Sequence, residues 1–258
     1  MNPLRLEQMT MFEIAPEEMI DIAEALDVPL VSVFLIDGMA GARPVTHANK
    51  APLLARLRDS SVRVDAAEVF MLGTQSEPPE TEIALAAELG CSAITALDIM
   101  PADDRQAADQ LAALCELAGS YGLVVALEPI SMGRTRTIHE GLRLIAAAGA
   151  PNLKLTIDLL HVMRTGTQLA DLAGLDRSLI ASAQVCDGPA LPPSDLVAEA
   201  SVERGIPGTG DFPIARFLEL LPPDATLGLE VPLASLREIG LSARERTRRV
   251  VEAVRRYG

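Results

Sequence analysis

The sequence alternates between short apolar runs and longer Ala-rich stretches, and this alternation constrains the fold more than any other feature. The runs are rich in Val, Ile and Leu and have the length of strands, whereas the stretches between them have helical spacing. Strands that alternate with helices predict a parallel sheet. The expected strands are 5–13, 29–36, 62–71, 92–98, 122–128, 152–158, 179–185 and 225–231.

The stretches between these strands carry the signals of helix ends. Pro16 followed by two glutamates is typical of a helix start, and Thr137 with Glu140 three residues later resembles a capping box. The expected helices lie near 16–26, 46–59, 79–89, 103–120, 137–148, 167–174, 213–221 and 242–256.

Eight strand–helix units in 258 residues fit a (β/α)₈ TIM barrel. A doubly wound open sheet is the alternative, and it would usually carry a Gly-rich turn after its first strand. The sequence has no GxGxxG and no GK[ST] motif, so nucleotide-binding folds are disfavoured. We therefore expect one TIM barrel domain over residues 1–258.

Charge and composition narrow the possible partners. Lys plus Arg total 22 against 36 Asp plus Glu, and a net charge of −14 repels the phosphates of nucleic acids. The three cysteines have no CxxC spacing, which favours free thiols in a reducing compartment. No secretory signal and no apolar run of about 18 residues is present. We expect a cytoplasmic protein that acts on a small molecule, without nucleic-acid or membrane binding.

Oxygen-bearing side chains end four consecutive expected strands: Glu128, Asp158, Gln184 and Glu230. The carboxyl ends of barrel strands meet on one face, and adjacent strands lie about 4.8 Å apart. Carboxylates are seldom buried unless they are paired or bind a metal. Three carboxylates and an amide oxygen favour Mn²⁺ or Mg²⁺ over a thiolate zinc centre. The alternative is that some of the four are solvated loop residues.

Of the three histidines, His161 lies nearest to these positions in the sequence. It follows Asp158 by three residues, in the expected loop after the sixth strand. There it could ligate a metal or donate a hydrogen bond to a substrate hydroxyl. His139 is expected on an outer helix and His47 in a loop or at a helix start, both without a catalytic role.

Arg204 is the only cation in the longest irregular stretch, residues 187–211. This stretch links the seventh strand to its helix, so it could fold over the barrel mouth as a lid. Arg204 could bind a substrate carboxylate or phosphate in bidentate fashion, or form a salt bridge that fixes the loop. Gly208 and Gly210 are expected to supply turn geometry.

The motifs together resemble a known family. They are Leu-Glu-Pro at 127–129, Asp158-Leu-Leu-His161, Gln184-Val-Cys-Asp-Gly, Arg204-Gly-Ile-Pro-Gly-Thr-Gly-Asp, and Glu230. This ordered set is similar to the xylose isomerase-like TIM barrels, the sugar phosphate isomerase/epimerase superfamily, across essentially the whole chain.

The resemblance implies roles for six residues. The metal ligands would be Glu128, Asp158, Gln184 and Glu230. His161 and Arg204 would contact substrate, with His161 also in the catalytic set. Glu128 and Glu230 would exchange a proton with the carbon next to a carbonyl, through an enediolate. The implied activity is that of a keto-sugar isomerase or epimerase.

The chain also departs from relatives of this fold. Gln184 stands where many epimerases have His, and three histidines cannot build the three-zinc centre of the related DNA-repair endonucleases. The only lysines, Lys50 and Lys154, lie in an expected helix and strand, so the lysine-assisted xylose isomerase mechanism is not expected. Without Trp, the candidate wall residues for a sugar ring are Phe12, Phe34, Phe70 and Phe212.

Two other functions stay open on the sequence alone. Gln184 is compatible with a 3-dehydroshikimate dehydratase-type lyase, which would begin with the same proton abstraction and give Arg204 a substrate carboxylate. A non-catalytic binding barrel is the other possibility. A homo-oligomer that pairs through outer helices is possible, although no face is identified.

Overall fold

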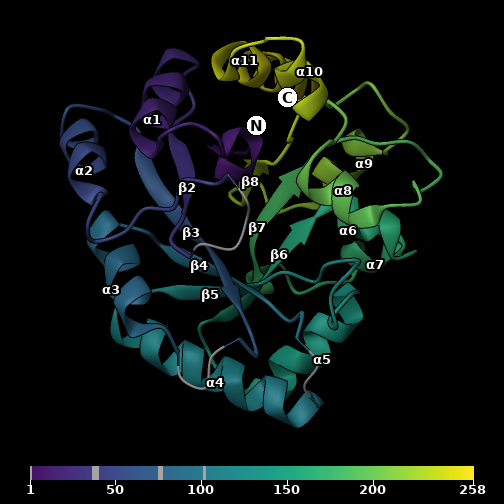
Figure 1. Cartoon of the computed structure of the whole chain (residues 1–258). Coiled ribbons are helices and arrows are strands. Elements are labelled where there is room, and N and C mark those ends of the chain that lie inside the picture. The colour runs from purple at the N-terminus through teal and green to yellow at the C-terminus, as the bar shows by residue number, and fades with distance from the viewer. Residues whose placement is uncertain (1, 37–40, 75–77, 101–102) are drawn as a thin grey trace.

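The computed structural model describes residues 2–36, 41–74, 78–100 and 103–258. Eight strands form a closed barrel in which each strand pairs in parallel with its sequence neighbours, and β1 closes onto β8 (Figure 1). This confirms the expected (β/α)₈ fold. The strands are β1 (Leu4–Leu6), β2 (Leu30–Phe34), β3 (Arg63–Met71), β4 (Ala93–Leu97), β5 (Val124–Leu127), β6 (Leu153–Asp158), β7 (Ile180–Val185) and β8 (Thr226–Leu229).

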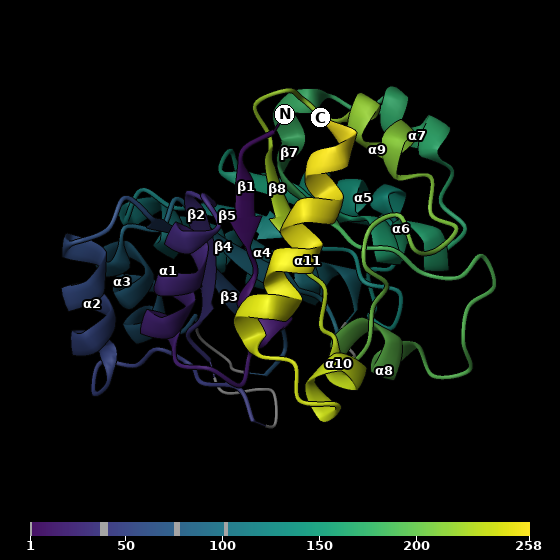
Figure 2. The ribbon, with the colours of Figure 1, turned by 90° about the horizontal axis from the view of Figure 1, so that it is seen from above.

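Helices surround the barrel, and the two chain ends lie close together (Figure 2). In the described ranges, no helix is long and apolar enough to cross a membrane. The longer helices are α1 (Pro16–Ala25), α2 (Lys50–Arg58), α3 (Glu80–Leu89), α4 (Asp104–Ser120), α5 (Ile138–Ala148), α9 (Ile214–Leu220) and α11 (Ala243–Val254). Shorter ones are α6 (Leu159–Arg164), α7 (Leu169–Ala173), α8 (Leu196–Ser201) and α10 (Ala234–Glu238), with 3₁₀ turns η1 (Gln8–Met11), η2 (Arg177–Leu179) and η3 (Arg255–Tyr257).

Local sequence signals explain several helix ends. The hydroxyl of Thr137 accepts a hydrogen bond from the backbone N–H of Glu140, and the Glu140 carboxylate accepts one from the backbone N–H of Thr137. The expected capping box at the start of α5 is therefore confirmed. This helix ends at Gly149, whose φ of +65° is a conformation that favours glycine.

The first strand is much shorter than expected, because the prediction over 5–13 does not hold beyond Leu6. The chain turns there into η1, whose polar side chains satisfy neighbouring backbone groups. Gln8 accepts a hydrogen bond from the backbone N–H of Phe34 over 2.6 Å. The Thr10 hydroxyl donates to the carbonyl of Leu229 over 2.7 Å. The turn therefore closes part of the barrel mouth.

Short helices also occupy segments that were expected to be loops. Residues 187–211 contain α8, and the segment directly after β6 is α6. The Asp187 carboxylate accepts backbone hydrogen bonds from Gly188, Gly208, Gly210 and Phe212, so the two ends of this stretch are held together. The stretch is therefore an ordered strap rather than an irregular loop.

The apolar core lies between the sheet and the helices, whereas much of the barrel interior is polar. TIM barrels usually fill this interior with branched aliphatic residues. Here Arg5 donates from Nε to Oε1 of Glu7 over 2.9 Å and from a terminal nitrogen to Asp65 over 3.1 Å. The hydroxyls of Thr156 and Ser182 lie 3.0 Å apart. Hydrogen-bonded groups therefore extend through the barrel beneath its mouth.

Candidate active site

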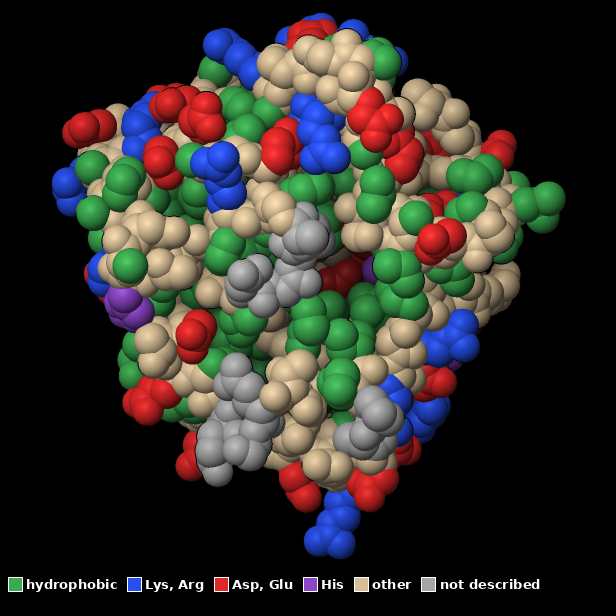
Figure 3. Space-filling model, viewed as in Figure 1, with side chains coloured by type: hydrophobic (Ala, Val, Ile, Leu, Met, Phe, Trp, Pro, Cys, Tyr) green, Lys and Arg blue, Asp and Glu red, His purple; other side chains and the backbone are tan. Residues whose placement is uncertain are grey.

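The four predicted strand-end residues lie together at the carboxyl ends of the last four strands. Glu128 follows β5, Asp158 ends β6, Gln184 lies on β7 and Glu230 follows β8. All four are at most 7% exposed, so they are not solvated loop residues. The mouth appears in Figure 3 as a hollow with acidic atoms inside it and hydrophobic side chains around it.

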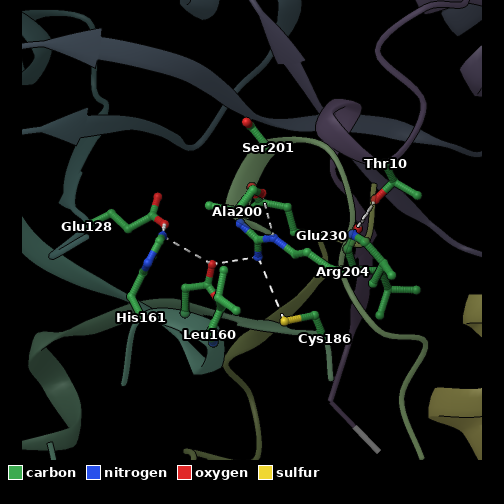
Figure 4. A network of polar contacts seen from close by, with 12 residues as sticks. Thr10, Glu128, Leu160, His161, Cys186, Ala200, Ser201, Arg204 and Glu230 are labelled. Atoms are coloured by element: carbon green, nitrogen blue, oxygen red, sulfur yellow. Dashed lines mark hydrogen bonds and ion pairs between the residues drawn. The ribbon is translucent and has the colours of Figure 1, made fainter. Parts of the chain in front are cut away.

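The guanidinium of Arg204 lies inside this acidic cluster (Figure 4). One terminal nitrogen donates to Oδ2 of Asp158 over 2.8 Å, and the other donates to Oε1 of Glu230 over 3.1 Å. Its Nε donates to the carbonyl of Ala200 on α8 over 2.8 Å. The two carboxylates raise the pKa of Arg204 although burial opposes its charge. Arg204 is thus a buried counter-charge to two predicted metal ligands, and its contact with substrate stays a prediction.

His161 lies on α6, not in the loop expected after the sixth strand. Its position follows from Asp158, whose Oδ1 accepts the backbone N–H of Leu160 over 2.8 Å and so caps α6. Nε2 of His161 lies 3.8 Å from Oε1 of Glu128 and 3.7 Å from Oδ2 of Asp158 (Figure 4). The helix therefore turns the imidazole toward the acidic cluster.

A backbone group fixes the tautomer of His161. The N–H of Ser131 donates to Nδ1 over 3.2 Å. Because a backbone N–H can only donate, Nδ1 is the acceptor and the ring proton lies on Nε2. Burial lowers the pKa of His161 to about 4, so the ring is neutral at neutral pH. His161 is therefore arranged as a hydrogen-bond donor toward the mouth.

Glu128 and Glu230 are both held in surroundings that favour the protonated carboxyl group. Burial raises the pKa of Glu128, and the charges of Glu230 and Asp158 raise it further. Burial also raises the pKa of Glu230 to about 8, with Arg204 opposing this effect and Asp158 adding to it. A carboxyl group with a pKa of about 8, such as that of Glu230, can accept and return protons near neutral pH.

Thr10 fixes the backbone on both sides of Glu230. Its hydroxyl donates to the carbonyl of Leu229 over 2.7 Å and accepts the N–H of Val231 over 2.9 Å. Sequence reasoning missed Thr10 because it was assigned to the interior of the first strand. It also missed Ser131, whose backbone N–H and hydroxyl oxygen both lie 3.2 Å from Nδ1 of His161.

The donor atoms at the mouth fit a divalent cation. One ligand atom each from Glu128, Asp158 and His161 lie within 4.8 Å of one another, and because the His161 proton is on Nε2, the two carboxylates are the metal-binding part of this group. Asp158 and Glu230 contact the guanidinium of Arg204, and Glu128 lies beside His161. Once metal binding released the protons that burial favours on Glu128 and Glu230, the three carboxylates would carry more negative charge than Arg204 balances. Oε1 of Gln184 is buried and has no hydrogen-bond donor in the described part of the chain. Oxygen-rich sites of this kind suit hard cations such as Mg²⁺ and Mn²⁺.

The remaining candidate residues lie elsewhere or serve the scaffold. His139 is on α5 with 60% of its side chain exposed, and His47 precedes α2 with Nε2 3.3 Å from the carbonyl of Thr81. Lys50 pairs with Glu88 on α3, and Lys154 is within β6. Of the four aromatic residues expected to line a sugar site, Phe12 is half-buried, and the other three are buried: Phe34, Phe70 and Phe212.

This fold and this acid-lined mouth define a (β/α)₈ barrel with its polar site at the carboxyl ends of the strands. The chain belongs to the xylose isomerase-like TIM barrel family, whose model matches residues 79–257. A Streptomyces coelicolor protein provisionally named a hydroxypyruvate isomerase is 26% identical over 189 residues. That match covers 64% of this chain and 63% of the relative, so it spans less than two thirds of the relative's length.

Solved structures share the fold over nearly the whole chain. The IolI protein with a bound zinc atom superposes with a TM-score of 0.81 at 15% identity, covering 99% of this chain and 97% of that one. The probable 3-DHS dehydratase AsbF from Bacillus anthracis gives a TM-score of 0.74 at 15% identity, covering 99% of each chain. The proteins to which this chain is similar thus carry the names of an isomerase and of a dehydratase.

Proposed function

We propose that this protein is a divalent-metal-dependent isomerase or epimerase of small keto-sugars or related hydroxy-ketones. The observation that carries the proposal is the pair of buried carboxyl groups of Glu128 and Glu230, each with a raised pKa, on either side of the Asp158–Arg204 ion pair. Moving a proton to and from a carbon next to a carbonyl needs groups that work as acid and base near neutral pH.

The metal would be held by Glu128, Asp158, Gln184 and Glu230, and these oxygen donors favour Mn²⁺ or Mg²⁺. A bound divalent cation would polarise the substrate carbonyl and thereby acidify the neighbouring carbon. The charge balance supports this assignment, because metal binding would release the protons of Glu128 and Glu230, and the three carboxylates would then outnumber the one positive charge of Arg204.

The chain's own residues would then move the proton and hold the substrate. One of Glu128 and Glu230 takes the proton from the α-carbon, and the other returns a proton. His161, with its proton on Nε2, donates a hydrogen bond to a substrate oxygen near Glu128 and Asp158. Arg204 keeps Asp158 and Glu230 in place, and its remaining N–H groups can reach a substrate oxygen.

Isotope exchange tests this proposal. Protein with Mn²⁺ is incubated with a panel of ketoses and hydroxypyruvate in D₂O, and deuterium at the α-carbon is followed by NMR. We expect incorporation with the wild type and its loss in Glu128→Gln and Glu230→Gln. Glu219→Gln, an exposed change on α9, is the matched control. Absence of deuterium from every α-carbon of a broad panel would contradict the proposal.

A metal-dependent lyase that dehydrates 3-dehydroshikimate is the second candidate. It is favoured by the buried cation Arg204 beside the acids, since the substrate of such an enzyme carries a carboxylate. Against it, all three nitrogens of the Arg204 guanidinium already donate to protein oxygens, so a substrate carboxylate would have only the one remaining N–H on each terminal nitrogen. Formation of the ultraviolet absorbance of protocatechuate from 3-dehydroshikimate, lost in Glu230→Gln, would establish this activity. An unchanged substrate in the presence of Mn²⁺ excludes it.

A further inference from the structure

Oε1 of Glu68, beneath the mouth, is buried and has no hydrogen-bond partner within the described ranges. The same holds for Oε1 of Gln184 and Oε2 of Glu7. Gln184 and Glu7 are both at most 2% exposed, so bulk water does not readily donate a hydrogen bond to either of these two atoms. Buried acceptors of this kind are rare and call for an explanation, because leaving them unpaired is costly.

The side chains of Gln184 and Glu7 meet over Gly228 on β8. Gly228 pairs with Gln184 on β7 and with Arg5 on β1. The point where a Cβ on Gly228 would lie is only 1.9 Å from Oε1 of Glu7 and 2.9 Å from Cγ of Gln184. Only glycine leaves room here, and it lets the carboxylate of Glu7 approach the amide side chain of Gln184.

One of the two orientations of the Gln184 amide lets this side chain donate a hydrogen bond to Glu7. The oxygen and nitrogen ends of an amide have nearly the same shape, so hydrogen bonds decide which way it faces. With Nε2 toward Glu7, Gln184 donates to a carboxylate oxygen. Its own Oε1 then faces the mouth, where Glu128 and Asp158 lie.

Glu7 is itself held rigidly enough to orient a neighbour. It is fully buried, and Nε of Arg5 donates to its Oε1 over 2.9 Å. Arg5 is fixed in turn by Asp65 over 3.1 Å. The buried carboxyl group of Glu68 lies near Glu7, whose charge adds to burial in raising the pKa of Glu68. Since each carboxylate oxygen can accept more than one hydrogen bond, Glu7 can accept one from Gln184 in addition to that from Arg5.

We propose that Glu7 is a positioning residue that accepts a hydrogen bond from Nε2 of Gln184 and so directs the Gln184 carbonyl oxygen toward the candidate metal ligands. The expected effect of Glu7 on metal binding rests on the proposed function. Residues that orient a metal ligand in this way typically change metal affinity by about 10- to 100-fold when they are replaced.

A double-mutant cycle tests whether Glu7 acts through Gln184. Mn²⁺ affinity is measured by calorimetry for the wild type, Glu7→Gln, Gln184→Ala and the double variant. We expect Glu7→Gln to weaken binding about 10-fold or more in the wild type and less than about 2-fold in the Gln184→Ala background. An equal loss in both backgrounds would show that Glu7 acts by its charge or by general packing, and would overturn the proposal.

The same four proteins unfolded in urea without metal separate this proposal from the metal assignment. If the hydrogen bond exists, the two single changes destabilise the fold by more in total than the double variant does. If the wild type fails to bind Mn²⁺, the proposed metal site fails, while this non-additivity still supports the Glu7–Gln184 hydrogen bond. Additive effects in urea reject the hydrogen bond whatever the metal result.

Discussion

The backbone N–H of Ser131 donates to Nδ1 of His161, and this contact places the imidazole proton on Nε2. The loop after β5, which carries Ser131, therefore determines the chemistry of a side chain on α6. An imidazole nitrogen that carries a proton has no lone pair for a metal. His161 is consequently expected to act on substrate rather than as a ligand.

Replacing His161 should separate turnover from metal binding. We expect His161→Gln to lower kcat/KM by about 10²-fold or more, because a donor near the reacting oxygens is displaced. Mn²⁺ affinity, measured by calorimetry, should change by less than about 3-fold, which is well below the effect of losing a ligand. His139→Gln, on the exposed face of α5, is the matched control and should leave both unchanged. A large loss of Mn²⁺ affinity in His161→Gln would identify the residue as a ligand instead.

Removing Arg204 should lower the free energy of unfolding, because two buried acids would lose their counter-charge. Arg204→Gln leaves Asp158 and Glu230 without their counter-charge, so the metal-free protein should lose about 3–5 kcal/mol in its free energy of unfolding in urea. Saturating Mn²⁺ should recover part of this loss, because a bound cation supplies positive charge. Arg216→Gln removes an exposed pair with Glu219 and should cost at most about 1 kcal/mol. Equal effects of the two changes would contradict the importance of the buried pair.

Glu230 should make the stability of the metal-free protein depend on pH. Its pKa in the folded protein, about 8, is above the ordinary value of 4.5. The folded state therefore holds a proton that the unfolded state releases, and stability is lost as pH rises from about 4.5 through 8. The loss is at most about 1.4 kcal/mol per pH unit for one group.

Urea unfolding of wild type and Glu230→Gln at several pH values measures this contribution. The variant, which cannot titrate at this position, should lose less stability over the same range. Glu245→Gln, an exposed change on α11, is the control and should follow the wild type across this interval. Parallel profiles for wild type and Glu230→Gln would mean that Glu230 does not hold a proton in the folded state.

Gly228 should not tolerate even one added carbon. The Cβ of Gly228→Ala would lie 1.9 Å from Oε1 of Glu7, so Glu7 must move away from Arg5. We expect a loss of about 1–3 kcal/mol in the free energy of unfolding, together with weaker Mn²⁺ binding. Gly174→Ala is the matched control, because an added Cβ there meets nothing within 4 Å. A stable Gly228→Ala protein with unchanged Mn²⁺ affinity would contradict this packing.

The barrel and the location of the site could be predicted because both follow from periodicity. Once Glu128 and Asp158 are recognised at strand ends, the fold alone brings them to one face. The partner of Arg204 could not be predicted, since Arg204 is 46 residues from Asp158 in the sequence and meets it only through the path of the chain after α8. The predicted first strand is too long because the residues of η1 include enough apolar side chains to resemble a continuing strand.

The inner residues of the barrel were missed although the sequence holds a signal for them. Leu4-Arg5-Leu6-Glu7 alternates apolar and charged residues, which places both charges on the same face of β1. In a barrel that face points inward. Composition cannot show that Arg5 then donates to both Glu7 and Asp65, because Asp65 lies on β3, 60 residues away in the sequence.

The polar barrel interior limits which amino-acid substitutions this protein can accept during evolution. A lumen filled with aliphatic side chains tolerates exchanges of similar volume one residue at a time. Here Glu7, Gly228 and Gln184 depend on one another for space and hydrogen bonds, so a change at one is acceptable only when another changes too. Descendants of this chain should therefore vary first in the loops around the mouth, while these three positions change together or stay as they are.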